Sequence, residues 1–189
     1  MTLYKDRYRI ETTRLKGWDY SANGYYFVTI CTRNRECLFG DVVDGEMRLS
    51  AIGEVVQNSW QGIPEHFPNA RLDEFVIMPN HIHGIIIIIN PVETCHGMSL
   101  QRHHGMSLQK QQSNQFSKPK SGSLSMMINH YKSAVSRWCR KNDRDFAWQP
   151  RFYDHIIRNE KSRDEIQEYI VNNPMKWKLD KDNLANLYM

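Results

Sequence analysis

The chain has no long hydrophobic run, since its longest aliphatic stretch, Ile85–Ile89, is far too short to span a bilayer. Residues 1–20 are polar and lack the apolar core of a secretory signal peptide. Cysteine is scarce, and the four cysteines show no CxxC spacing: Cys31, Cys37, Cys95 and Cys139. We therefore expect a cytoplasmic protein with reduced thiols, without a membrane span, a zinc ribbon or a disulfide framework.

The length of 189 residues favours one domain, residues 1–189, that carries a long insertion. Hydrophobic residues make up 40% of the chain and charged residues 24%, which is the composition of an ordinary globular protein. The net charge of +4 favours an anionic partner only weakly, because many enzymes that never bind nucleic acid are equally basic.

Periodicity predicts four strands, a hairpin and three helices. The strands are residues 24–32, 71–78, 81–90 and 152–158, with the second and third joined as an antiparallel pair at Pro79-Asn80. Residues 36–50 predict a short hairpin with Asp44-Gly45 as its turn. The helices are residues 51–66, with Ser50 as N-cap, then 123–142, and a closing helix that begins at Ser162. Ser162 and Glu165 form a predicted capping box, and Pro174 ends this last helix.

Residues 91–122 have a different composition from the rest of the chain. They contain the tandem repeat "CHGMSLQR" and "HHGMSLQK", followed by a stretch rich in Gln, Ser, Lys and Pro. Cys95, His96, His103 and His104 could be interpreted as a metal cluster, but we favour a disordered insertion that grew by duplication. Without this insertion the order is strand, helix, strand, strand, helix, strand, helix. This order predicts an α+β fold, a ferredoxin-like antiparallel sheet with helices packed on it.

Two histidines open the most hydrophobic stretch, "VIMPNHIHGIIIII" at residues 76–89. Side chains two apart on a strand share a face, so His81 and His83 present two imidazoles together and Ile82 faces the other way. The pair could hold a metal ion if a third ligand came from elsewhere. By itself an H-x-H pattern is common enough to be coincidental.

The closing helix offers the missing groups. Tyr169 and Asn173 are four residues apart and so lie on one helical face. A tyrosine can act as a nucleophile, and the Asn carbonyl oxygen is an acceptable ligand for Mg²⁺ or Mn²⁺. Alternatively, Tyr169 is a packing residue beside Ile166 and Ile170.

Two other tyrosines are alternatives to Tyr169. Tyr131 lies among apolar helical positions and is expected in the core. Tyr153 shares a strand face with His155 and is the second candidate nucleophile.

Two motifs far apart in the chain resemble one family. "MPNHIHG" resembles the His-hydrophobic-His motif of the HUH single-tyrosine transposases, and "WQPRFYDHIIRNEKSRDEIQEYIVNNPMKW" resembles the C-terminal signature of their REP-associated branch. The matching positions are Trp148, Gln149, Arg151, Phe152, His155, Ile157, Arg158, Asn159, Tyr169, Ile170, Asn173, Pro174 and Lys176.

The resemblance implies the HUH endonuclease fold, with His81 and His83 as ligands of Mg²⁺ or Mn²⁺ and Tyr169 as the nucleophile that takes a 5′-phosphate. Related transposases have Gln four residues after the tyrosine as third ligand, where this chain has the shorter Asn173. His155 is expected as a hydrogen-bond partner of the site or a phosphate contact, and Arg151 and Arg158 as DNA-binding residues.

The implied activity is cleavage and rejoining of single-stranded DNA at or near hairpins, by a monomer rather than a homodimer. Two alternatives stay open. One is a replication-initiator-like nickase that mobilises nothing, and the other is a hairpin-binding protein with a vestigial metal site.

Overall fold

The computed structural model describes residues 3–4, 7–8, 14–90, 119–179 and 183. Its main sheet is antiparallel with the strand order β6-β7-β3-β8. These strands are β3 (Gly24–Cys31), β6 (Ala70–Met78), β7 (His81–Ile88) and β8 (Tyr153–Ile157). In chain order these are the second, third, first and fourth strands of the main sheet, which is the ferredoxin-like arrangement. The predicted α+β fold is therefore confirmed.

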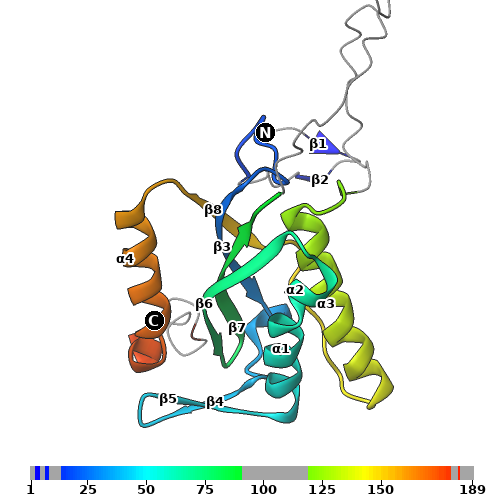
Figure 1. Ribbon diagram of the computed structural model, residues 1–189. Helices are drawn as coiled ribbons and strands as arrows, with labels where there is room; N and C mark the ends of the chain where they lie inside the picture. Colours follow the sequence, from blue (N-terminus) through cyan, green and yellow to red (C-terminus); the bar gives the residue numbers. More distant parts are fainter. Residues whose placement is uncertain (1–2, 5–6, 9–13, 91–118, 180–182, 184–189) are drawn as a thin grey trace, which may run out of the picture.

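Helices cover both faces of this sheet (Figure 1). On one face lie α1 (Ala51–Gln61), α2 (Ile63–His66) and α3 (Leu124–Lys141). The other face carries α4 (Glu160–Val171), which is followed by the 3₁₀ helix η2 (Pro174–Leu179). The short elements are β1 (Leu3–Tyr4), β2 (Arg7–Tyr8), η1 (Arg33–Arg35), and the hairpin of β4 (Gly40–Val43) and β5 (Glu46–Leu49). No helix in the described ranges has both the length and the apolarity needed to cross a membrane.

The two faces of the sheet bury very different amounts of apolar surface. The core between the sheet and α1 and α3 is large and contains Trp60 and Tyr131, so the expectation that Tyr131 is a packing residue is confirmed. Under α4 there is only a small cluster, built on Phe27, Ile85 and Ile170. Because buried apolar area is the main source of stability, the large core holds the sheet together. The α4 face is then free to carry polar side chains.

Gly84 follows the two histidines because Trp60 occupies the space beside it. A Cβ atom at this position would lie 2.5 Å from Cζ2 of Trp60. Any larger residue would therefore push the tryptophan out of its place in the core. The glycine lets α1 pack closely on β7, directly behind the histidines.

Two predicted helix boundaries are wrong. The helix expected over residues 51–66 ends at Gln61, and Gly62 separates it from the short α2, where Pro64 lacks the N–H that a continuous helix would use. The closing helix begins at Glu160, since the side chain of Asn159 accepts a hydrogen bond from the Ser162 backbone at 2.8 Å. Asn159 is therefore the N-cap, and Ser162 lies in the first turn.

The predicted insertion, residues 91–122, lies outside the described residues except for its last four positions. Its two ends meet at one side chain. Nδ2 of Asn69 donates to Oδ1 of Asn90 at 3.2 Å and to the carbonyl of Gly122 at 3.1 Å. These two hydrogen bonds hold Asn90 and Gly122 close together independently of the length of the segment that connects them.

We predict that this segment can be shortened without loss of the fold. Deleting residues 94–118 should leave a protein that unfolds cooperatively, because the remaining residues still span the short gap between Asn90 and Gly122 and because loop-closure entropy changes slowly with loop length. Chemical unfolding monitored by circular dichroism checks this. Loss of the cooperative transition would show that the segment contains a structural element.

Candidate active site

The two histidines of β7 lie side by side on the sheet face that α4 covers. His81 and His83 are 0% and 2% exposed, and their Nε2 atoms are 3.0 Å apart. Ile82, between them, belongs to the large core on the other face. Two neighbouring ligands at about 2.1 Å from an octahedral ion are separated by about 3.0 Å, so the two nitrogens have the spacing of shared metal ligands.

Each imidazole is oriented by a contact at its other ring nitrogen. Nδ2 of Asn80 donates to the Arg35 carbonyl at 2.9 Å, which leaves its Oδ1 to accept from Nδ1 of His81 at 2.8 Å. The hydroxyl of Thr29 lies 2.8 Å from Nδ1 of His83. Partners of this kind fix the tautomer and the direction of a ligating imidazole. These contacts hold the two Nε2 atoms 3.0 Å apart.

Tyr169 joins this pair from α4. Its hydroxyl lies 3.1 Å from Nε2 of His83, and the two ring centroids are 5.2 Å apart. The side chain is 37% exposed, whereas the neighbouring Ile170 is completely buried. Ile170 therefore holds the helix on the sheet, and Tyr169 presents its hydroxyl at the edge of the contact.

A polar pair also holds α4 in place. Nε2 of Gln167 lies 2.8 and 2.9 Å from the two carboxylate oxygens of Asp73. Asp73 sits where the register of β6 shifts between Leu72 and Phe75. A bulge of this kind can redirect a side chain out of the regular strand alternation, so it offers Asp73 to the helix. Gln167 is two residues before Tyr169, so its contact with Asp73 helps to fix the position of the tyrosine over the sheet.

Asn173 lies just beyond the end of α4, four residues after Tyr169. It is 2% exposed, and its Oδ1 is buried without a hydrogen-bond partner among the described residues. Tyr169, four residues before it, contacts His83, and the ring of Trp177, four residues after it, lies 6.0 Å from the ring of His81. A buried carbonyl oxygen without a partner is costly in free energy unless a cation or a water compensates it.

Three contributors were not singled out from the sequence: Phe27, Thr29 and Trp177. The ring of Phe27 stacks on His83 with centroids 5.4 Å apart. Strand alternation puts Phe27 and Thr29 on one face, but only the pairing register of β3 with β7 brings Thr29 opposite His83. Trp177 lies within the quoted C-terminal motif, yet its position beside His81 depends on where η2 packs.

The remaining predicted residues lie on or beside β8. Tyr153 and His155 share the site face of the sheet and are exposed, and the side chain of Tyr153 makes no hydrogen bond with the described residues. His155 is not a hydrogen-bond partner of His81 or His83 among the described contacts. Instead it lines a cleft of about 450 Å³ together with Arg158, Asn159 and Ser162.

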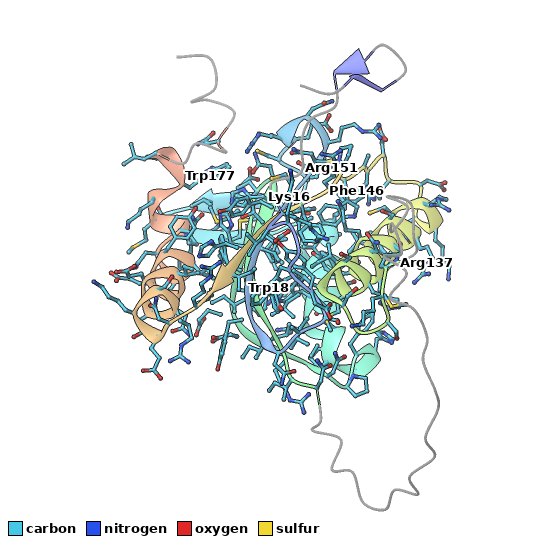
Figure 2. The ribbon with its side chains drawn as sticks, turned by 90° about the horizontal axis from the view of Figure 1, so that it is seen from above. Lys16, Trp18, Arg137, Phe146, Arg151 and Trp177 are labelled. Carbon is cyan, nitrogen blue, oxygen red and sulfur yellow. The ribbon has the colours of Figure 1, made fainter. Side chains whose placement is uncertain are left out.

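Arg151 precedes β8 in an unusual backbone conformation, with φ of 68°. Nζ of Lys132 fixes this segment by donating to the carbonyls of Gln149 and Arg151, both at 2.8 Å, and burial lowers the pKa of Lys132 to about 8. In Figure 2, Arg151 lies between Trp177, which follows α4, and Arg137, which is on α3. All of α3, including Arg137, lies in the layer on the opposite face of the sheet from α4.

These side chains differ from the Cys- and His-rich set of a structural zinc site. No group of three or more His, Cys, Asp or Glu side chains in the described part of the chain could hold a metal ion. The groups that meet here are two imidazoles and a phenol, and the buried amide oxygen of Asn173 follows the phenol by four residues. A nitrogen and oxygen ligand set with open positions is compatible with Mg²⁺ or Mn²⁺ and leaves room for a phosphate.

The chain is similar to one known protein in sequence and to two solved structures in fold comparison. An uncharacterized protein of Haemophilus influenzae is 44% identical over 171 residues, which cover 88% of this chain and 89% of that protein. A REP-associated tyrosine transposase, solved bound to a REP hairpin, has a TM-score of 0.54 and 20% identity, and the match covers 96% of this chain and 77% of that one. A candidate transposase of Deinococcus radiodurans has a TM-score of only 0.41 and 15% identity, over 85% of this chain and 97% of that one, which is too low a score to indicate a shared fold.

No family model matches the chain. At 20% identity the likeness to the solved transposase is evidence for the fold alone, and it agrees with the resemblance seen in the two motifs. The chain belongs to one family with the Haemophilus influenzae protein, and its fold is that of a REP-associated tyrosine transposase.

Proposed function

We propose that this chain is a metal-dependent DNA strand transferase that cleaves and rejoins single-stranded DNA at or near hairpins. The observation that carries the proposal is the meeting of His81 Nε2, His83 Nε2 and the Tyr169 hydroxyl on one sheet face. Tyr169 and His83 are 86 residues apart in sequence, yet their polar atoms are 3.1 Å apart. A packing tyrosine would have no need of this arrangement.

The divalent ion in this proposal is Mg²⁺ or Mn²⁺, held by His81, His83 and Asn173. The buried Oδ1 of Asn173, which lacks a partner in the described part of the chain, supports its role as third ligand. Asn173 lies between two residues that reach the histidines: the Tyr169 hydroxyl is 3.1 Å from Nε2 of His83, and the Trp177 ring is 6.0 Å from the ring of His81. When bound, the ion supplies a Lewis acid that polarises the phosphodiester.

Tyr169 is the nucleophile in this proposal. Its hydroxyl oxygen attacks the phosphorus, the bond from phosphorus to the 3′-oxygen breaks, and the net reaction moves the phenol proton to that oxygen. The products are a 5′-phosphotyrosine and a free 3′-hydroxyl. Attack by another 3′-hydroxyl reverses the step and joins two strands without external energy, because the ester bond is conserved in the intermediate.

The proposed substrate is an unpaired strand beside a hairpin. In-line attack needs a splayed backbone, which a single strand offers more readily than a duplex. The solved structure with the same fold is bound to a REP hairpin, and this supports a hairpin as the recognised feature. Arg151 and Arg158, at the two ends of β8, are proposed contacts for the phosphate backbone.

We propose that the chain acts as a monomer, with a homodimer as the alternative. Both histidines, Tyr169 and Asn173 come from one chain, and the hydrogen bond between Tyr169 and His83 forms within it. A partner is therefore not needed to supply the nucleophile, in contrast to transposases that exchange this helix between subunits.

The function is tested by incubating the protein with a labelled hairpin that has unpaired flanks, in Mg²⁺ or Mn²⁺. We expect a covalent protein–DNA adduct on a denaturing gel, and joined product when a second strand with a free 3′-hydroxyl is added. Hairpin binding without any adduct would favour the hairpin-binding alternative. Cleavage without joining would favour the nickase.

A further inference from the structure

The site face is open beside Tyr169 at the start of β8. Helix α4 packs mainly on β6, and Ile170 shares its small apolar cluster with Ile157 near the end of β8, whereas the start of β8 is exposed. There Tyr153 is 49% exposed. It is a large aromatic side chain on a sheet face that is otherwise occupied by the nucleophile and the histidines.

Tyr153 lies in line with the proposed metal site. In the strand register it pairs with Thr29, and Thr29 pairs with His83. Neighbouring strands are about 4.8 Å apart, so the main chain of Tyr153 lies about 10 Å from that of His83. This distance suits the nucleotide next to one held at the histidines.

Phe27 supports Tyr153 from below. Its buried ring meets Tyr153 and Tyr169 edge-on, with centroid distances of 6.4 Å to each, and it stacks on His83. The ring of Tyr153 therefore packs against Phe27, while about half of the Tyr153 surface is exposed to solvent. A supported aromatic ring with an open surface is the usual platform for an unpaired nucleobase.

Positive charge flanks this platform along β8. Arg151 stands two residues before Tyr153, and Arg158 lines the cleft of about 450 Å³ just past the end of the strand, with His155. Asp154, which also lines the cleft, is paired with Arg14 at 3.0 Å. The positive charge of Arg151 and Arg158 beside the platform suits the phosphates of a DNA strand.

We propose that Tyr153 is a stacking platform for an unpaired base adjacent to the phosphate that Tyr169 attacks, and that the strand continues along β8 towards the cleft. This inference rests on the proposed function and names where its substrate lies. It also assigns Tyr153 a role different from that of a second nucleophile.

The test compares binding of a hairpin with an unpaired extension to binding of the same hairpin without it. Tyr153→Ala should weaken binding of the extended hairpin between about fivefold and 150-fold, the equivalent of one base–aromatic stacking contact, and leave the blunt hairpin unaffected. Tyr153→Phe keeps the ring and should restore most of the affinity. Met126→Ala, at an exposed apolar residue of α3 in the opposite layer, serves as the matched control.

A second readout separates stacking from a structural role. With 2-aminopurine in the unpaired extension, wild type and Tyr153→Phe should quench its fluorescence and Tyr153→Ala should not. At saturating DNA, Tyr153→Ala should form adduct at close to the wild-type rate, because loss of uniform binding raises KM and spares kcat.

Two results would overturn this inference alone. Equal affinity of wild type and Tyr153→Ala for the extended hairpin would exclude stacking, and loss of adduct in Tyr153→Phe would make Tyr153 the nucleophile. If wild type formed no adduct but bound the extended hairpin more tightly than Tyr153→Ala did, the proposed chemistry would be refuted and the platform supported. Absence of all DNA binding would refute both.

Discussion

Tyr169→Phe is expected to abolish the covalent adduct while the protein still folds and binds hairpin DNA. The substitution removes one oxygen, the atom that lies 3.1 Å from Nε2 of His83. Removing a covalent nucleophile lowers turnover by at least about 10⁴-fold. The lost hydrogen bond costs about 1 kcal/mol of stability, so unfolding curves should change little. A denaturing gel with labelled single-stranded DNA measures the adduct.

Tyr153→Phe is the matched control for this experiment, since it removes the same atom from the other tyrosine that borders Phe27. Its adduct should form as in the wild type. If the adduct persisted in Tyr169→Phe and disappeared in Tyr153→Phe, the assignment of the nucleophile would be reversed. If both variants kept the adduct, neither tyrosine would be the attacking residue.

The second large effect concerns the histidines. His81→Ala combined with His83→Ala should lower cleavage by roughly 10²- to 10⁴-fold, because a Lewis acid contributes several kcal/mol to the stabilisation of a phosphoryl transition state. Removal of divalent ions from wild type with a chelator should have an effect of the same size, and adding Mn²⁺ should restore activity only in the wild type. Calorimetric titration with Mn²⁺ should show binding that the double variant lacks.

Thr29→Val is a graded control for the metal site. It keeps the shape of the side chain and removes the hydroxyl that lies 2.8 Å from Nδ1 of His83. Loss of such an orienting partner usually costs about 10- to 100-fold in metal affinity or activity. We therefore expect an effect between wild type and the double alanine variant. Full activity of wild type in excess chelator would contradict the metal-dependent mechanism.

The sequence could predict which residues share a face, but not which faces meet. Strand alternation put His81 and His83 together, and the four-residue spacing put Tyr169 and Asn173 together. The distance from Tyr169 to His83 depends on how α4 docks, and its anchors are tertiary contacts of Ile170 and of Gln167 with Asp73. In the sequence these anchors look like ordinary helix and strand residues.

The start of α4 and the position of His155 also depend on the three-dimensional structure, and the sequence alone could not predict them. Both Asn159 and Ser162 are good N-cap residues, and the polar residues between them give no periodicity that separates the two. Only the main-chain geometry, with Asn159 in an extended conformation, decides the matter. His155, expected beside the site, is on the right face but lies on the open edge strand, because the sheet order puts β3 between β8 and β7.

Tyr169 is proposed to carry the 5′-phosphate, and one mapping experiment tests this most directly. Hairpin DNA labelled at its 3′ end or at its 5′ end is reacted with wild type in Mn²⁺, and the adduct is digested and sequenced by mass spectrometry. We predict that only the 3′-labelled strand stays attached and that the nucleotide is found on the peptide containing Tyr169. Attachment of the 5′-labelled strand, or of a nucleotide to Tyr153, would contradict the account.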